Sequence, residues 1–144
     1  MSGAASVLEA AVAAGRAGLG SGEPELLATM RQLAGLHARA GDPAAARRLL
    51  EEAYEAGARH GADGALLALM AYDLAVVAGE LGNRHEARKN FERVAAVGPA
   101  ALGADHEAVA RARAFLDDAT RNDPDPGPPS GLGAAAASGT RSGR

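Results

Sequence analysis

Cysteine and tryptophan are missing from this sequence, and its aromatic side chains are limited to two Phe and two Tyr in 144 residues. Without cysteine there is no disulfide framework and no thiolate metal site, and the composition is compatible with a reducing cytoplasm. Apolar residues still make up 47% of the chain, which is enough for the core of one domain. Because that core must consist of Leu, Val, Met and Ala, we expect closely packed elements held by many small contacts.

Long apolar runs and a concentration of one charge sign are also absent. No stretch reaches the ~18 apolar residues of a membrane span. The apolar stretch near the N-terminus is interrupted by Glu9 and preceded by no Lys or Arg, unlike a signal peptide. The net charge is −3, with both signs interspersed. Nucleic acid binding needs a concentrated basic stripe, so we expect neither nucleic acid nor a membrane as partner and predict a cytoplasmic protein.

No arrangement of residues typical of catalysis or of cofactor binding is found. His85-Glu86 and His106-Glu107 begin like the zinc motif HExxH, but Lys89 and Ala110 stand where its second histidine is required. The glycines of residues 18–22 follow no predicted strand and lead to no Gly-Lys-Ser/Thr sequence, so they do not form a phosphate-binding loop. We therefore expect no catalytic residue, no cofactor and no metal, and hence no enzyme.

The most regular stretch, residues 26–58, predicts two amphipathic helices joined by a short turn. The apolar face of the first helix has the i, i+3, i+4, i+7 spacing of a 3.6-residue period and consists of Leu26, Met30, Leu33, Ala34 and His37. Gly41 suits the left-handed conformation that ends a helix, Asp42 can cap the next one, and Pro43 fits its first position. The inner face of the second helix carries Ala46, Leu50, Ala53 and Gly57.

The same pattern recurs at a period of 41 or 42 residues. Moving forward by 41 matches Gly41 to Gly82 and Gly57 to Gly98, and moving back by 42 matches Gly57 to Gly15. A fixed period in this range is typical of stacked helix hairpins. The repeats divide residues 1–121 into a half repeat (4–18), two full repeats (24–60 and 64–99) and a terminal half repeat (105–121). Residues 122–144 are rich in Pro, Gly and Ala and are predicted to be a disordered tail.

Three further signals predict the ends of helices. Asn83 and Glu86 have the spacing of a capping box, in which each side chain bonds the backbone N–H of the other residue. Pro99 is predicted to end the second full repeat, and Asp105 to cap the last helix.

The recurring positions resemble those of the tetratricopeptide repeat. They are Met30, Leu33-Ala34, His37, Gly41, Ala46, Leu50 and Ala53 in the first copy, and Ala71, Leu74-Ala75, Ala78, Gly82, Ala87, Phe91, Val94 and Pro99 in the second. The long period and the linker LGADHEAV are similar to the kinesin-light-chain-like repeats common in bacterial regulators. The resemblance implies an all-α fold, a right-handed superhelical stack of antiparallel helix hairpins with about six helices. It also implies a partner-binding groove lined by the first helix of each hairpin.

The register of that family places thirteen residues in the groove: Ala28, Arg31, Gly35, Ala38, Arg39, Leu69, Tyr72, Asp73, Val76, Glu80, Arg111, Ala114 and Asp118. We select seven as the candidate site, namely Arg31, Arg39, Leu69, Tyr72, Asp73, Val76 and Arg111. Tyr72 between Leu69 and Val76 is the candidate apolar anchor, unless it simply covers a neighbouring helix. Arg31 and Arg111 are the candidates to pair with a carboxylate of a ligand.

Three functions remain open from the sequence. The preferred hypothesis is a non-enzymatic scaffold or adaptor that binds a peptide or a partner surface in the groove. The second is a structural repeat protein that forms a homo-oligomer through its terminal helices, residues 4–17 and 106–120, because stacked arrays need polar capping helices. The third, suggested by the resemblance, is a regulatory domain of a bacterial signalling ATPase or transcription factor system.

Overall fold

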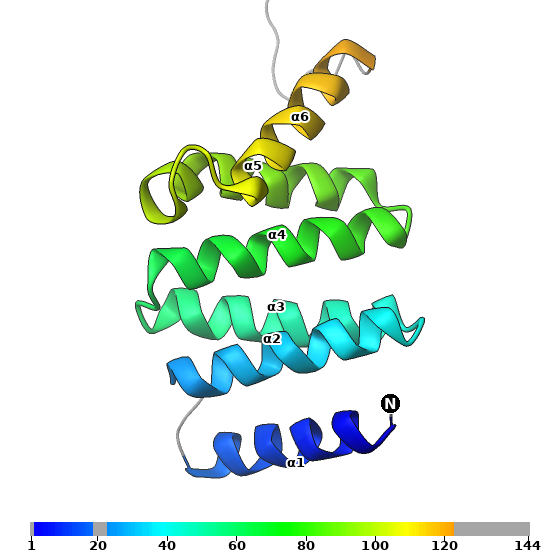
Figure 1. Cartoon of the computed structure of the whole chain (residues 1–144), viewed down its shortest axis with the longest axis vertical. Coiled ribbons are helices and arrows are strands. Elements are labelled where there is room, and N and C mark those ends of the chain that lie inside the picture. The colour runs from blue at the N-terminus through cyan, green and yellow to red at the C-terminus, as the bar shows by residue number, and fades with distance from the viewer. Residues whose placement is uncertain (1, 19–22, 123–144) are drawn as a thin grey trace, which may run out of the picture.

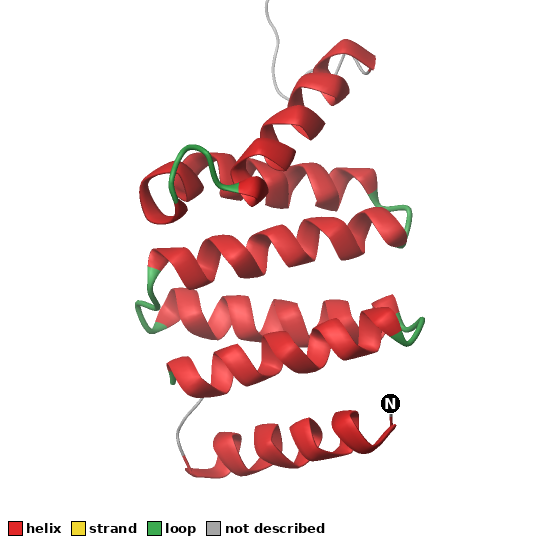
Figure 2. Ribbon diagram, viewed as in Figure 1, coloured by secondary structure: helices red, strands yellow, loops and turns green. Residues whose placement is uncertain are grey.

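The structure is a computed structural model that describes residues 2–18 and 23–122, without the side chains of residues 2 and 4. The predicted tail lies outside these residues, apart from residue 122. The described part is all-helical and has six helices: α1 (Ser2–Gly18), α2 (Pro24–Arg39), α3 (Pro43–Arg59), α4 (Gly64–Glu80), α5 (Arg84–Leu102) and α6 (Glu107–Asn122). They stack one after another along the chain, and α6 leaves the stack at an oblique angle (Figures 1 and 2). The predicted all-α stack of helix hairpins is confirmed.

Glycines in the left-handed conformation form the turns between the helices. Gly41, Gly61 and Gly82 have φ values of 87°, 72° and 79°. In each turn the next residue donates its N–H to a carbonyl in the last turn of the preceding helix, with a distance of 2.8 Å from Asp42 N to His37 O. This bond is typical of the Schellman motif, which reverses the chain directly after a helix. As predicted, the Asp42 side chain then caps α3 by accepting from Ala45 N at 3.1 Å.

The first helices of the hairpins, α2, α4 and α6, lie on the same side of the stack and are called the A helices below. Each helix packs against its neighbours in the chain, and in addition α2 packs against α4 and α4 against α6. Within the described residues the second helices, α1, α3 and α5, do not pack on one another in this way. Instead, ion pairs between long side chains link them, from Arg16 to Glu52 at 2.6 Å and from Arg47 to Glu86 at 3.0 Å. The A helices therefore form one continuous face.

A repeated glycine sets the distance between successive hairpins. A Cβ atom added to Gly57 would lie 3.2 Å from Ala62 Cβ, Leu27 Cδ1 and Leu67 Cδ2. At Gly98 it would lie 2.9 Å from Val109 Cγ2, and at Gly15 it would lie 2.8 Å from Leu26 Cδ1. Leu26, Leu67 and Val109 are themselves related by the 41- or 42-residue period. The sequence period is thus a structural one, in which glycine allows each second helix to approach the next A helix.

The core contains mostly Leu, Ala, Met and Val, as the composition predicts. One buried cluster joins α1 to α4 around Leu27, Met30 and Met70, and another joins α4 to α6 around Val94 and Val109. The second cluster also contains aromatic rings. The Phe91 and Phe115 rings lie 4.7 Å apart, and Tyr72 meets Phe91 edge-on at 6.1 Å. These rings fix α6 against α4 and α5.

Three predicted helix ends need correction. The side chain of Asn83 accepts from Glu86 N at 3.0 Å, as a capping box requires. Glu86 does not bond the Asn83 N–H in return, because that group donates to Ala78 O in the turn. Pro99 does not end α5, which continues to Leu102. Asp105 does not cap α6, because Ala108 N donates to the ring Nδ1 of His106 at 3.0 Å.

Candidate partner-binding groove

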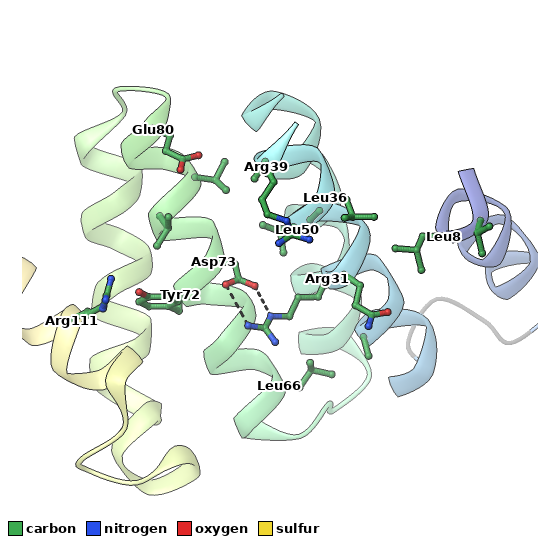
Figure 3. Close-up of a pocket in the computed structure, with 18 residues that line it drawn as sticks. Leu8, Arg31, Leu36, Arg39, Leu50, Leu66, Tyr72, Asp73, Glu80 and Arg111 are labelled. Carbon is green, nitrogen blue, oxygen red and sulfur yellow. Dashed lines mark hydrogen bonds and ion pairs between the residues drawn. The ribbon is translucent and has the colours of Figure 1, made fainter. Parts of the chain in front are cut away.

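A broad groove of about 1120 Å³ lies on the face of the A helices. Its main lining comes from α2 and α4, with contributions from α1, α3 and α6 (Figure 3). Six of the seven candidate residues line it, namely Arg31, Arg39, Tyr72, Asp73, Val76 and Arg111. Leu69 is half-buried on α4 and does not belong to the lining. The register of the repeat therefore brings most of the candidate residues together.

An ion pair crosses the groove from α2 to α4. Arg31 Nε lies 2.5 Å from Asp73 Oδ2, and Arg31 Nη2 lies 3.5 Å from Asp73 Oδ1 (Figure 3). Burial raises the pKa of Asp73 above its usual 3.8, while Arg31 acts in the opposite direction. The side chains remain 35% and 27% exposed. Arg31 thus already has a carboxylate partner within the chain, and an incoming carboxylate would have to compete with Asp73.

Tyr72 and Val76 form the apolar part of the groove on α4. Tyr72 is half-buried and contacts Phe91 from one side while it lines the groove from the other. It therefore has both of the roles considered from the sequence: it covers a neighbouring helix and it is open to the groove. Val76 is 39% exposed, although valine is usually buried. Val76 is a better test of an apolar contact with a ligand than Tyr72, because replacing Val76 would disturb the core less.

Arg111 and Arg39 supply positive charge at the edges of the groove. Arg111 lies beside Tyr72 (Figure 3), and it pairs with Glu107 at 2.7 Å, four residues away on α6. The nearby Tyr72 and Glu107 raise the pKa of Arg111, so it keeps its charge. Arg39 is exposed in the last turn of α2 and has no ion pair among the described residues. Arg39 can therefore bind an acidic ligand, and so can Arg111, because its pair with Glu107 is exposed to solvent and such surface pairs are weak.

The groove also extends to α1, which the sequence analysis did not include. Val7 and Leu8 line it from α1, and Gln32 and Leu36 from the facing side of α2. The signal was present in the sequence, because Leu8 occupies the position of Leu50 one period earlier. The resemblance to the tetratricopeptide repeat implies a groove lined by the A helices alone, so it does not predict the contribution of α1.

The opposite side of the stack carries a self-contained polar network. Glu86 is 8% exposed and accepts from Arg47 Nε at 3.0 Å and from Asn83 Nδ2 at 3.1 Å. Asn90, 2% exposed, donates to Glu86 O and accepts from Arg93. These buried polar groups have partners inside the chain, so the network is explained by stability without a ligand. A smaller cavity of about 360 Å³ lies beside it, between α3 and α5.

In the parts of the chain that the structure describes, no three His, Asp or Glu side chains are grouped so that they could hold a metal ion. None of the described helices combines the length and the apolar character needed to cross a membrane. Comparison with known proteins gives no family model that matches the chain, and no curated protein that matches it.

Proposed function

We propose that this protein is a non-enzymatic interaction module, similar to long-period tetratricopeptide repeats, that binds a peptide or a partner surface in the groove of the A helices. The observation that supports this most directly is the exposed Val76 beside Tyr72, in a groove of about 1120 Å³. An apolar surface with charged groups at its edge is the usual composition of a protein-binding site. The cytoplasmic location expected from the sequence is part of the same proposal.

The charges of the groove indicate what such a ligand contains. Arg31 and Asp73 neutralise each other. The other charged residues of the lining are Arg39, Arg111 and Glu80, so its remaining net charge is positive. A ligand with an apolar side chain on Val76 and an acidic side chain near either arginine would leave no buried charge without a partner. We therefore propose an apolar and acidic peptide.

The test is a selection of random peptides displayed on phage against the full chain. The affinity of a selected peptide is then measured by fluorescence anisotropy for the wild type and two variants. Val76→Glu places a negative charge in the groove and is expected to weaken binding at least about tenfold. Val97→Glu is the matched control, because Val97 is a similarly exposed valine, 46% against 39%, on α5 and outside the groove. Equal binding by both variants would contradict the proposal.

Self-association is the second candidate function, because Val7 on the terminal helix α1 is 68% exposed. The two terminal helices differ in this respect. On the outer side of α6 the exposed positions include Arg113, Asp117 and Thr120. Of the two terminal helices that the structure describes, α1 has an exposed large apolar side chain and α6 has none.

A further inference from the structure

Helix α1 is the repeat equivalent of α3, but one of the sides that are covered in α3 is not covered in α1. Helix α3 packs against two A helices, α2 before it and α4 after it. Among the described helices α1 packs closely against α2 alone, and its Arg16 forms an ion pair with Glu52 of α3. The side of α1 that corresponds to the α2-facing side of α3 is therefore open.

The exposure of equivalent residues shows this difference. In α3, Leu50 and Ala53 are 1% and 0% exposed under α2. Their equivalents 42 residues earlier are Leu8, which is half-buried, and Ala11, which is exposed. Val7 beside them is 68% exposed. The apolar residues that are covered in the middle of the array are thus uncovered at its beginning.

Helix α2 completes this open surface from the other side. Val77 of α4 is 4% exposed and shares a buried cluster with Leu50 of α3 and Ala34 of α2. The equivalent of Val77 in α2 is Leu36, which is half-buried and lines the groove together with Leu8. Figure 3 shows Leu8 and Leu36 in the space between α1 and α2. We call the surface formed by Val7, Leu8, Ala11, Gln32 and Leu36 the α1–α2 face.

We propose that the α1–α2 face binds an amphipathic helix of a partner protein, in the position that α2 takes on α3 and α4. This deepens the proposed interaction function, on which it rests, by naming one class of partner. The model for the partner is α2 itself, where Leu27 and Met30 share a buried cluster with Ala53, and Ala34 shares one with Leu50. The partner helix therefore needs Leu, Met or Ala at i, i+3 and i+7.

The ion pair between neighbouring A helices also predicts one polar contact with this partner. Gln32 stands at the position of Asp73, the residue that binds Arg31 across the A helices. A polar side chain of the partner at the position of Arg31 would therefore meet the amide of Gln32. The partner helix has a charged or polar residue four positions after its first apolar anchor, as Arg31 follows Leu27.

The helices of a second copy fit this surface less well. Among the described A helices only α6 has the corresponding side free, since α2 and α4 are covered there by α3 and α5. At the positions of Ala71 and Ala75, which are 1% and 0% exposed on α4, helix α6 carries Arg113 and Asp117. Placing these charges on an apolar face would be costly. The chemistry of the face therefore favours a helix of a different protein.

The test uses the peptide of residues 24–40, which presents the apolar side that already fits α3. It is titrated into ¹⁵N-labelled full-length protein, and the amide shifts are followed by NMR. We expect saturable shifts at Leu8, Ala11 and Leu36, and no such shifts with a peptide that carries Met30→Asp. In the protein, Ala11→Glu should weaken binding at least about tenfold.

Ala10→Glu is the matched control, because it makes the same change one residue away on the exposed outer side of α1, where α3 already has the exposed Glu52. Val7→Asn, at a residue that is 68% exposed, is a second variant that removes apolar surface without a risk to folding. Val76→Glu should leave binding of this peptide unchanged. This variant separates failure at the α1–α2 face from failure of the groove proposed above.

Absence of saturable shifts, or equal binding by Ala11→Glu and Ala10→Glu, would overturn the inference. So would light scattering that shows a dimer of the wild type, if Ala11→Glu dissociates it and Ala10→Glu does not. In that case a second copy, and not a partner helix, occupies the α1–α2 face.

Discussion

Replacement of Gly57 by alanine tests whether the repeated glycine sets the spacing of the hairpins. In an unobstructed helix interior, Gly→Ala stabilises a protein by about 0.8–1 kcal/mol. At Gly57 the new methyl group would lie 3.2 Å from three carbon atoms, one of them the Cβ of Ala62, which cannot rotate away. Overpacking of this kind costs about 1–3 kcal/mol. We expect Gly57→Ala to lower the free energy of unfolding by about 1 kcal/mol, the difference between the two terms.

Gly79→Ala is the matched control, because Gly79 is exposed in the last turn of α4, as Gly57 lies in the last turn of α3, and an added Cβ would have no neighbour within 4 Å. It should raise the free energy of unfolding by about 0.8–1 kcal/mol. Both variants change helix propensity equally, so the difference between them measures the overpacking cost alone. Urea unfolding followed by circular dichroism at unchanged m-value gives both numbers. The reasoning is refuted if the two substitutions stabilise the protein equally.

Two further predictions concern ion pairs. Arg47→Met leaves the buried carboxylate of Glu86 without its main partner and should destabilise the protein by about 1–3 kcal/mol. Arg88→Met breaks only a surface pair and should destabilise it by no more than about 0.5 kcal/mol. Equal midpoints of urea unfolding for the two variants would contradict this prediction. The raised pKa of Asp73 means that its contribution to stability is full below the usual pKa of 3.8 and is lost as the pH rises through its folded value. Arg31 lowers the pKa of Asp73, so Arg31→Met should raise that pKa further. An NMR titration of the Asp73 carboxyl carbon measures the pKa in both proteins, and a wild-type value at or below 3.8 would contradict the raised pKa.

The sequence predicts the helix hairpins well because their ends are decided locally. Gly41 and Asp42 act within one turn of chain, and the structure shows the positive φ and the side-chain cap that these residue types favour. The right-handed superhelical path is a prediction of the resemblance that the helix assignment does not test. The errors also have local causes. Asp105 and His106 are neighbours that can both cap, and composition alone does not decide which one lies at the helix start.

Pairing across the groove is not local, and the sequence does not predict it. The register of the repeat places Arg31 and Asp73 in the same groove but does not show that they bind each other. The two residues are 42 positions apart, and their contact depends on how α2 and α4 are rotated about their axes. A period of 41 or 42 residues fixes which residues are equivalent, but not this rotation. Side-chain partners between repeats therefore had to come from the structure.

The two ends of the array differ in the side chains that they expose to solvent. At the α6 end, Arg113 and Asp117 occupy positions that are buried alanines in α4, so that end is solvated as a capping helix is. At the α1 end, Leu8 and Ala11 retain the apolar character of Leu50 and Ala53 without their cover. Hydration of apolar surface is unfavourable, whereas hydration of charge is not. Docking of an added helix is therefore more favourable at α1 than at α6. Because Val7 also lines the groove, a partner docked at α1 would lengthen the groove rather than close it.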